Sequence, residues 1–262
     1  MLQNIVLEKI KESYINYLIY GPHSTKKIVP LHEGVEYWYR TNLPSFDIQH
    51  IGNKGEYIAE GQFFNKNVDL AIWKNSKEIE KIVSVKFPMT TIKSNLINYL
   101  EGALGECYNL ENYPCEYFFV LRYKTPELSV KGKVKSITII DSEFLSIIEN
   151  IAKSKYIDHL HILVVDIIPT LEEPYNMIPT LNILLKELGI SDFDKFIYKH
   201  VIAKYGFIDL NLLRIFHKYQ HKPLWDIRTK IHSKRRKEIE PIFKELKTMM
   251  MNFFEIKKIV EK

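Results

Sequence analysis

Strand-like segments are confined to the first two thirds of this 262-residue chain, and this limits the folds that it can adopt. Runs rich in β-branched and aromatic residues occur at residues 56–63, 67–73, 81–87, 115–123, 136–140 and 160–168. Helical periodicity follows the third run at residues 94–110 and returns at residues 142–153. Three strands followed by alternating helices and strands indicate an α/β sandwich with a mixed central sheet.

Beyond Pro169 the segments have helical rather than strand periodicity. The charge also changes sign along the chain. From Lys195 to Lys262 there are 17 Lys and Arg against 7 Asp and Glu, whereas the residues before Lys195 have 20 against 25. We therefore expect two domains, residues 1–175 and a basic helical domain of residues 176–262. The basic excess is typical of a polyanion-binding surface, although solvated helix faces carry similar charge.

The composition is that of an ordinary globular protein, with 46% hydrophobic and 26% charged residues. No run approaches the roughly 18 apolar residues of a membrane span. The N-terminal segment carries Glu8, Lys9 and Lys11, which a secretory signal would not tolerate. The two cysteines, Cys107 and Cys115, are too few for a disulfide scaffold or a four-ligand zinc site. We expect a cytoplasmic protein that has no membrane partner.

Two charged residues lie inside otherwise apolar strand-like segments. Asp69 is in VDLAI and Lys86 is in IVSVKF. Adjacent strands would bring such side chains within reach of each other, and buried charges need a partner, a metal ion or a substrate. Glu60 and Glu101 add carboxylates nearby in the sequence. The group suits a hard divalent cation such as Mg²⁺. A plain ion pair between Asp69 and Lys86 is the alternative.

The segment from residue 56 to residue 123 resembles the core of the PD-(D/E)xK nuclease superfamily, which includes most type II restriction endonucleases. That core has a carboxylate on the second strand, a carboxylate-x-Lys on the third strand, and then a helix. Here Asp69 is followed by Ser84-Val85-Lys86, so Ser84 stands where the pattern has a carboxylate. One subgroup of restriction endonucleases has Ser-x-Lys and takes its second carboxylate from the following helix, where Glu101 lies.

The resemblance implies a restriction-endonuclease-like α/β/α sandwich with a mixed central sheet and a site that holds one or two Mg²⁺ ions. Asp69 and Glu101 would be metal ligands, together with the backbone carbonyl of Val85 and with Glu60 as an additional acid. Lys86 would orient the attacking water or stabilise the extra negative charge. Helical periodicity alone does not decide between Glu101 and Glu106 as the helix carboxylate, and we favour Glu101 because it lies nearer to the N-terminus of the helix.

Two segments are candidate DNA contacts. The start of the helix after Lys86 carries polar residues whose position suits phosphate binding, or else simple capping, namely Lys93, Asn95 and Asn98. The C-terminal residues 208–249 resemble a winged-helix or helix-turn-helix module, whose third helix would present Lys234, Arg235 and Arg236 to DNA. Pro241 is unfavourable inside such a helix. A basic helical bundle with a purely structural role is the alternative.

These features predict a Mg²⁺-dependent type II restriction endonuclease that cleaves double-stranded DNA at a specific sequence. Such an enzyme would act as a homodimer, because a palindromic site mirrors a symmetric protein. It would also have a cognate DNA methyltransferase. Two alternatives stay open: a structure-specific nuclease of defence or transposition with the same fold, and a catalytically inactive DNA-binding regulator, which the Ser84 departure would explain.

Overall fold

The structure is a computed structural model, and we describe the following residues of it: 4–21, 23–50, 69–75, 78–89, 93–108, 114–122, 124–128, 134–138, 141–153, 159–169, 180–187, 189–192, 194–197, 199 and 210–261. The chain divides into two compact units. Unit 1 comprises Met1–Ile10, Pro30–Ile167 and Ile256–Lys262, and unit 2 comprises Lys11–Val29 and Ile168–Glu255. The predicted boundary at residue 175 and the roles predicted for the two parts stay predictions.

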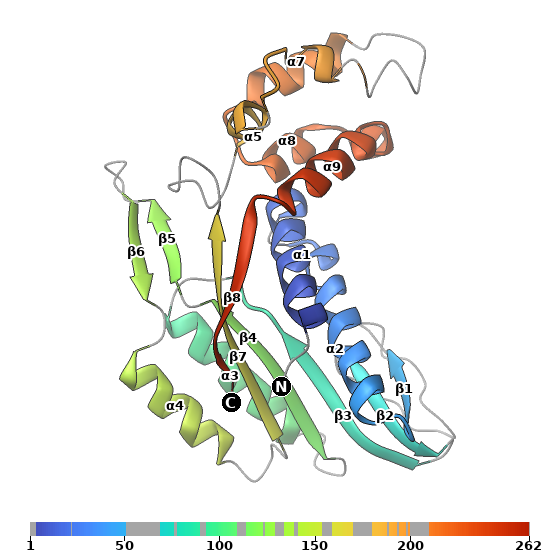
Figure 1. Cartoon of the computed structure of the whole chain (residues 1–262), viewed down its shortest axis with the longest axis vertical. Helices are drawn as coiled ribbons and strands as arrows, with labels where there is room; N and C mark the ends of the chain where they lie inside the picture. Colours follow the sequence, from blue (N-terminus) through green and yellow to red (C-terminus); the bar gives the residue numbers. More distant parts are fainter. Residues whose placement is uncertain are drawn as a thin grey trace. The chain divides into compact units, whose positions relative to one another are not determined.

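The core of unit 1 is a mixed six-stranded sheet with the strand order β1-β2-β3-β4-β7-β8 (Figure 1). Strands β1, β2 and β3 form an antiparallel meander, whereas β3, β4 and β7 are parallel. The strands are β1 (Asp47–His50), β2 (Leu70–Asn75), β3 (Glu78–Lys86), β4 (Cys115–Arg122), β7 (His159–Pro169) and β8 (Phe254–Glu261). The predicted α/β class with a mixed sheet is confirmed. A separate antiparallel pair consists of β5 (Lys124–Leu128) and β6 (Val134–Thr138).

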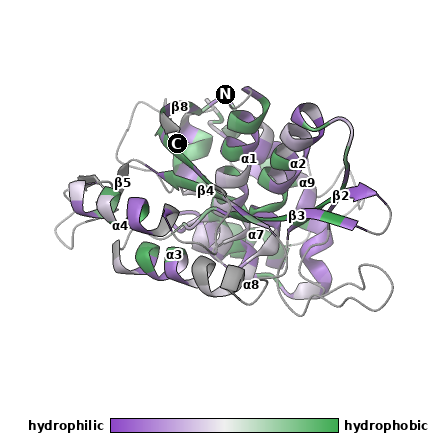
Figure 2. Ribbon diagram, turned by 90° about the horizontal axis from the view of Figure 1, so that it is seen from below, coloured by the Kyte–Doolittle hydropathy of each residue, from purple (hydrophilic) through white to green (hydrophobic). Residues whose placement is uncertain are grey.

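Helices connect the parallel strands because parallel neighbours need a crossover. Helix α3 (Lys93–Tyr108) follows β3, and α4 (Ser142–Ala152) precedes β7. One face of the sheet forms a hydrophobic core with these two helices, to which Leu96, Leu100, Tyr117, Phe119, Phe144 and Ile148 contribute. Figure 2 shows the hydrophobic colouring of β4 beside the mixed colouring of α3 and α4.

The other face of the sheet contacts α2 (Val29–Asn42), where the Trp38 ring packs edge-on against the Phe118 ring at a centroid distance of 6.2 Å. Strand β4 is therefore covered on both faces, and all of its residues are buried. This agrees with its nearly continuous apolar sequence, which is typical of a central parallel strand.

The structure contains two elements that the sequence did not predict. Strand β8 occupies FEIKKIVE, a segment in which we expected no strand, and it lies next to β7. This segment contains two consecutive lysines, Lys257 and Lys258, and charged residues are common in strands at the margin of a sheet. Helix α2 lies in a segment for which the sequence predicted no element. The strand predicted at residues 56–63 lies outside the described residues.

Unit 2 contains the C-terminal half of α1 (Asn4–Tyr20) and a set of short helices. These are η1 (Thr25–Lys27), α5 (Leu181–Glu187), α7 (Leu210–Tyr219), α8 (Leu224–Lys230), η2 (Ser233–Arg235) and α9 (Arg236–Met250). Buried side chains include Phe216, Leu224, Ile227 and Phe243. Helix α9 continues through Pro241, the residue that we expected to be unfavourable there.

Within the described residues, no helix has both the length and the apolar character that a membrane crossing requires.

Gly34 provides a test of the packing in unit 1. A Cβ atom added at Gly34 would lie 2.9 Å from the Lys9 Cβ and 3.6 Å from the Val6 Cα, so α1 and α2 would have to separate. We expect Gly34→Ala to lower the free energy of unfolding by about 1–3 kcal/mol, as overpacking generally does. Thermal and denaturant unfolding monitored by circular dichroism measure this.

Gly102→Ala is the matched control, because a Cβ added there meets no atom within 4 Å in the part of the chain that we describe. It should be neutral or stabilise by up to about 1 kcal/mol through helix propensity. Equal stabilisation by both substitutions would contradict the close packing of α1 on α2.

Candidate active site at the β2–β3 strand pair

Asp69 immediately precedes β2 and is held against β3 by hydrogen bonds. Its Oδ2 accepts a hydrogen bond of 2.6 Å from the Val85 backbone N–H and one of 3.3 Å from the Ser84 hydroxyl. Its own N–H donates to the Val83 carbonyl at 3.2 Å. Asp69 is only 5% exposed, so these donors compensate for the loss of hydration of a buried carboxylate.

The register of β2 and β3 explains this contact. Leu70 pairs with Val83, so the residue before β2 reaches Ser84 and Val85 near the C-terminal end of β3. Lys86 is the last residue of β3 and is half-buried. Residues alternate between the faces of a strand, so Ser84 and Lys86 share the face on which Ile82 packs against α3. The structure thus brings Asp69, Ser84 and Val85 into contact, with Lys86 as the next residue.

Glu101 lies on α3 and is exposed, whereas its neighbour Leu100 is fully buried against the sheet. No contact between Glu101 and Asp69 is observed in the described part of the chain. Glu60 and the side chain of Glu106 lie outside the described residues, so the choice between Glu101 and Glu106 stays open.

His32 is a site residue that the sequence analysis missed. It lies on α2, is 7% exposed, and its Nε2 is 3.5 Å from the Asp69 Oδ1. The imidazole therefore faces the carboxylate oxygen that the β3 donors leave accessible. Nothing in the sequence predicts this contact, because His32 lies in a segment without recognisable periodicity and is far from Asp69 along the chain.

Arg122 is a second residue that the sequence did not reveal. It ends β4, is 6% exposed, and its Nη2 donates a 2.7 Å hydrogen bond to the Met89 carbonyl. Met89 belongs to the segment that leads from Lys86 towards α3. Arg122 therefore fixes the start of this connection near the carboxyl ends of the parallel strands, which is where ligands usually bind in α/β sheets.

The donors available for a metal ion are the Asp69 carboxylate, the His32 imidazole and the Val85 carbonyl. Among the described residues, no group of three or more His, Cys, Asp or Glu side chains lies close enough together to hold an ion. The Asp69 oxygen suits a hard cation such as Mg²⁺, and an imidazole nitrogen also suits Mn²⁺. A further carboxylate from α3 would complete such a donor set.

A second polar cluster surrounds Glu116 of β4, which pairs with Val83 of β3. The Glu116 Oε1 accepts a 2.6 Å hydrogen bond from the Lys81 Nζ, and its Oε2 contacts the Tyr39 hydroxyl and, at 3.3 Å, the His161 Nε2. Glu116 pairs with Val83 and its neighbour Tyr117 pairs with Ser84, so Glu116 lies on the face of the sheet opposite to Ser84. The cluster shares no residue with the Asp69 site, and it joins α2 to β3, β4 and β7.

The cluster perturbs the ionisation of both Glu116 and Tyr39. Burial raises the pKa of Glu116, but the hydrogen bonds from His161, Lys81 and Tyr39 outweigh it and lower the pKa to about 2. Burial, reinforced by the Glu116 charge, raises the pKa of Tyr39 far above its ordinary value. Because each Glu116 oxygen has donors, the cluster has the features of a structural ion-pair network.

The candidate DNA-contacting residues differ in their exposure and in the partners that they already have. Asn95 and Asn98 are exposed in the first turns of α3, and the side chain of Lys93 lies outside the described residues. Lys234 is exposed. The Arg235 guanidinium donates to the Glu238 Oε2 at 3.1 and 2.7 Å, and the Arg236 Nε donates to the Ile231 carbonyl at 3.3 Å. Both arginines are therefore already engaged within unit 2.

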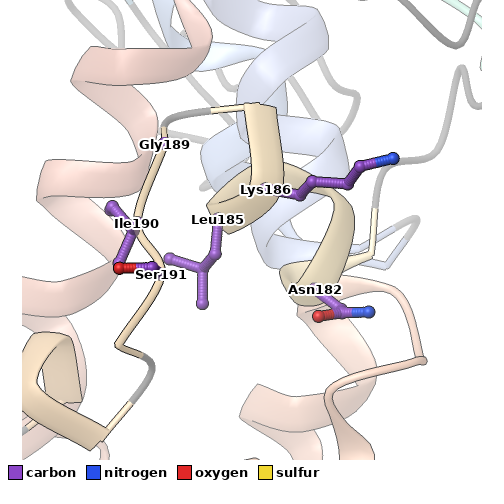
Figure 3. Close-up of a pocket in the computed structure, with 6 residues that line it drawn as sticks. All are labelled: Asn182, Leu185, Lys186, Gly189, Ile190 and Ser191. Atoms are coloured by element: carbon purple, nitrogen blue, oxygen red, sulfur yellow. The ribbon is translucent and has the colours of Figure 1, made fainter.

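Unit 2 also contains a pocket of about 340 Å³ (Figure 3). It lies at the C-terminal end of α5 and is lined by Asn182, Leu185, Lys186, Gly189, Ile190 and Ser191. None of the site residues predicted from the sequence contributes to it.

Comparison with protein-family models, with curated proteins and with solved structures finds no match for this chain. Its function must therefore be argued from its own residues.

The Glu116 cluster predicts a specific acid dependence of stability. The folded-state pKa of about 2 lies below the ordinary value of 4.5, so the contribution is complete above pH 4.5 and is lost as the pH falls towards 2. A shift of this size corresponds to about 3 kcal/mol. Glu116→Gln should therefore unfold more readily at neutral pH and lose less stability between pH 4.5 and 2.

Chemical denaturation across this pH range measures the effect, with Glu101→Gln as the control because Glu101 is exposed. A Glu116→Gln variant with the same pH dependence as the unmodified protein would rule out the proposed role of the cluster.

Proposed function

We propose that the chain is a metal-dependent endonuclease of the PD-(D/E)xK type that cleaves double-stranded DNA at a specific sequence, as type II restriction endonucleases do. The observation that supports this most strongly is the contact of the buried Asp69 carboxylate with Ser84 and Val85, directly before Lys86. An acid and a lysine at the same end of an adjacent strand pair are the residues on which the sequence resemblance rests.

The topology is compatible with this proposal. An antiparallel meander, a helix and then a parallel strand occur in the order β1, β2, β3, α3 and β4. The resemblance implies three strands followed by a helix for the catalytic core. The finer fold, a restriction-endonuclease-like sandwich, is part of the proposal.

The chemistry follows from the residues at the site. Asp69 would hold a divalent cation, together with a carboxylate of α3 such as Glu101. When bound, such an ion polarises a phosphoryl oxygen and lowers the pKa of a bound water. The Lys86 ammonium would orient the attacking water and stabilise negative charge that develops on the phosphate. His32 contacts the Asp69 Oδ1 and would keep the carboxylate in a fixed orientation.

Unit 2 would contribute to DNA recognition. Helices α7, α8 and α9 follow one another with short connections, as in the helix-turn-helix module that the sequence resembles. We propose that the enzyme works as a homodimer on duplex DNA in the cytoplasm, alongside a cognate methyltransferase.

One observation favours a second candidate, an inactive DNA-binding regulator. Ser84 occupies the place of a catalytic carboxylate, and Glu101 is exposed rather than directed at Asp69 in the described part of the chain. A structure-specific nuclease of the same fold would share the Asp69 site, and substrate choice would separate it from a restriction enzyme.

The proposal predicts Mg²⁺-dependent cleavage of unmethylated, phage-length duplex DNA into discrete fragments, and none in EDTA. Lys86→Ala and Asp69→Asn should each reduce the cleavage rate at least roughly 100-fold, because the first removes a cation that stabilises developing negative charge and the second weakens the metal site. Glu101→Ala and Glu106→Ala, assayed in parallel, identify the helix carboxylate. Gel electrophoresis of the products measures the rate.

Lys153→Ala is the control for these variants, since Lys153 is an exposed lysine that follows α4. Circular dichroism establishes whether each variant is folded. Absence of cleavage of both linear and branched DNA by the unmodified protein would refute the nuclease proposal and favour the regulator.

A further inference from the structure

The exposed side of α7 and the segment that follows it carry a basic surface. We define this α7–α8 basic surface as Arg214, Lys218, Lys222 and Lys230, all of which are exposed. The first three recur every four residues, so Arg214 and Lys218 lie on the same side of α7. The opposite side of α7 is buried through Leu212, Leu213 and Phe216, and α7 contains no acidic residue.

Five carboxylates in the described part of unit 2 form ion pairs with other residues. Their ion-pair partners are Glu12 with Lys247, Asp194 with His217, Glu238 with Arg235, Glu240 with Lys26 and Arg228, and Glu245 with Lys199. Within the described residues, the four cations Arg214, Lys218, Lys222 and Lys230 are not paired with carboxylates.

Two of these cations lie close to the ring of Tyr219. The Lys218 Nζ lies 5.6 Å and the Lys230 Nζ 5.7 Å from the centroid of the Tyr219 ring. A cation near an aromatic ring is attracted by it, with a free energy of about 0.5–1 kcal/mol at exposed positions. The ring therefore keeps ammonium groups from two helices close together, despite their mutual repulsion.

Around Tyr20, by contrast, the cations near the ring are paired with a carboxylate. Lys26 and Arg228 lie 4.7 and 5.0 Å from the Tyr20 ring centroid, but Glu240 lies within 3.5 and 4.0 Å of the same two cations. The two sites differ in this respect. The lysines at Tyr219 can bind an external anion, whereas Lys26 and Arg228 at Tyr20 are paired with Glu240 inside unit 2.

We infer that the α7–α8 basic surface binds the phosphate backbone of duplex DNA, through contacts that do not depend on base sequence. The choice of DNA among polyanions rests on the proposed function. Arg235 and Arg236, which the sequence predicted as DNA contacts, already donate to Glu238 and Ile231, so they would have to break these bonds to contact DNA. Lys218 and Lys230 need no such exchange.

Counterion release provides a quantitative test. Each lysine–phosphate contact adds about 0.9 to the steepness of log Kobs against log salt concentration. Binding of the full chain to a fluorescent 30-base-pair duplex is measured in EDTA by anisotropy across a range of NaCl concentrations. Lys218→Gln/Lys230→Gln should reduce the slope by about 2 and weaken binding at 0.1 M salt by roughly 10- to 100-fold.

Two double variants are compared under the same conditions. Lys153→Gln/Lys195→Gln removes the same charge from other exposed positions and should leave the slope almost unchanged. Arg235→Gln/Arg236→Gln tests the alternative surface and should have a smaller effect than Lys218→Gln/Lys230→Gln. Thermal unfolding of each variant verifies that it is folded.

Three outcomes would overturn the inference: an Lys218→Gln/Lys230→Gln slope equal to that of the charge control, a larger loss in Arg235→Gln/Arg236→Gln, or no DNA binding by the unmodified protein. Binding to phosphatidylserine vesicles without binding to DNA would overturn it as well. Because EDTA prevents cleavage, failure of this inference is distinguishable from failure of the nuclease proposal, which the cleavage assay tests separately.

Discussion

The contact between Asp69 and the end of β3 is the constraint on which the candidate site depends. A carboxylate that is 5% exposed is costly to bury unless hydrogen bonds replace its hydration. The Val85 N–H and the Ser84 hydroxyl supply those bonds, and they can do so only in the observed antiparallel register of β2 and β3. A slip of one residue would turn Ser84 and Lys86 to the opposite face.

The two buried carboxylates of the sheet have different surroundings. Glu116 is surrounded by Lys81, Tyr39 and His161, and its oxygens are occupied by these donors. Asp69 presents its Oδ1 towards His32 at 3.5 Å, which is long for a hydrogen bond. The first arrangement is typical of a structural network. The second leaves coordination capacity on a fixed carboxylate, and this is what a metal site needs.

The sequence predicted the elements whose patterns are strong. The runs around Asp69 and Lys86, the apolar run of β4 and the periodic helices α3 and α4 all correspond to elements of the structure. Strand β8 was missed because its lysines weaken the strand pattern. The contacts of His32 and Arg122 could not be predicted, because they join residues far apart in the chain that only the folded sheet brings together. The nuclease site itself stays a prediction.

Metal binding in the absence of DNA tests the central claim most directly, because it separates the site from substrate recognition. Mn²⁺ bound to the unmodified protein and to Asp69→Asn can be counted by electron paramagnetic resonance. Asn retains the shape of Asp and an oxygen that accepts from Val85. The account predicts saturable Mn²⁺ binding that Asp69→Asn weakens at least about tenfold, since even loss of a residue that only hydrogen-bonds to a metal ligand typically costs about this much. Equal Mn²⁺ affinity in the two proteins would contradict it.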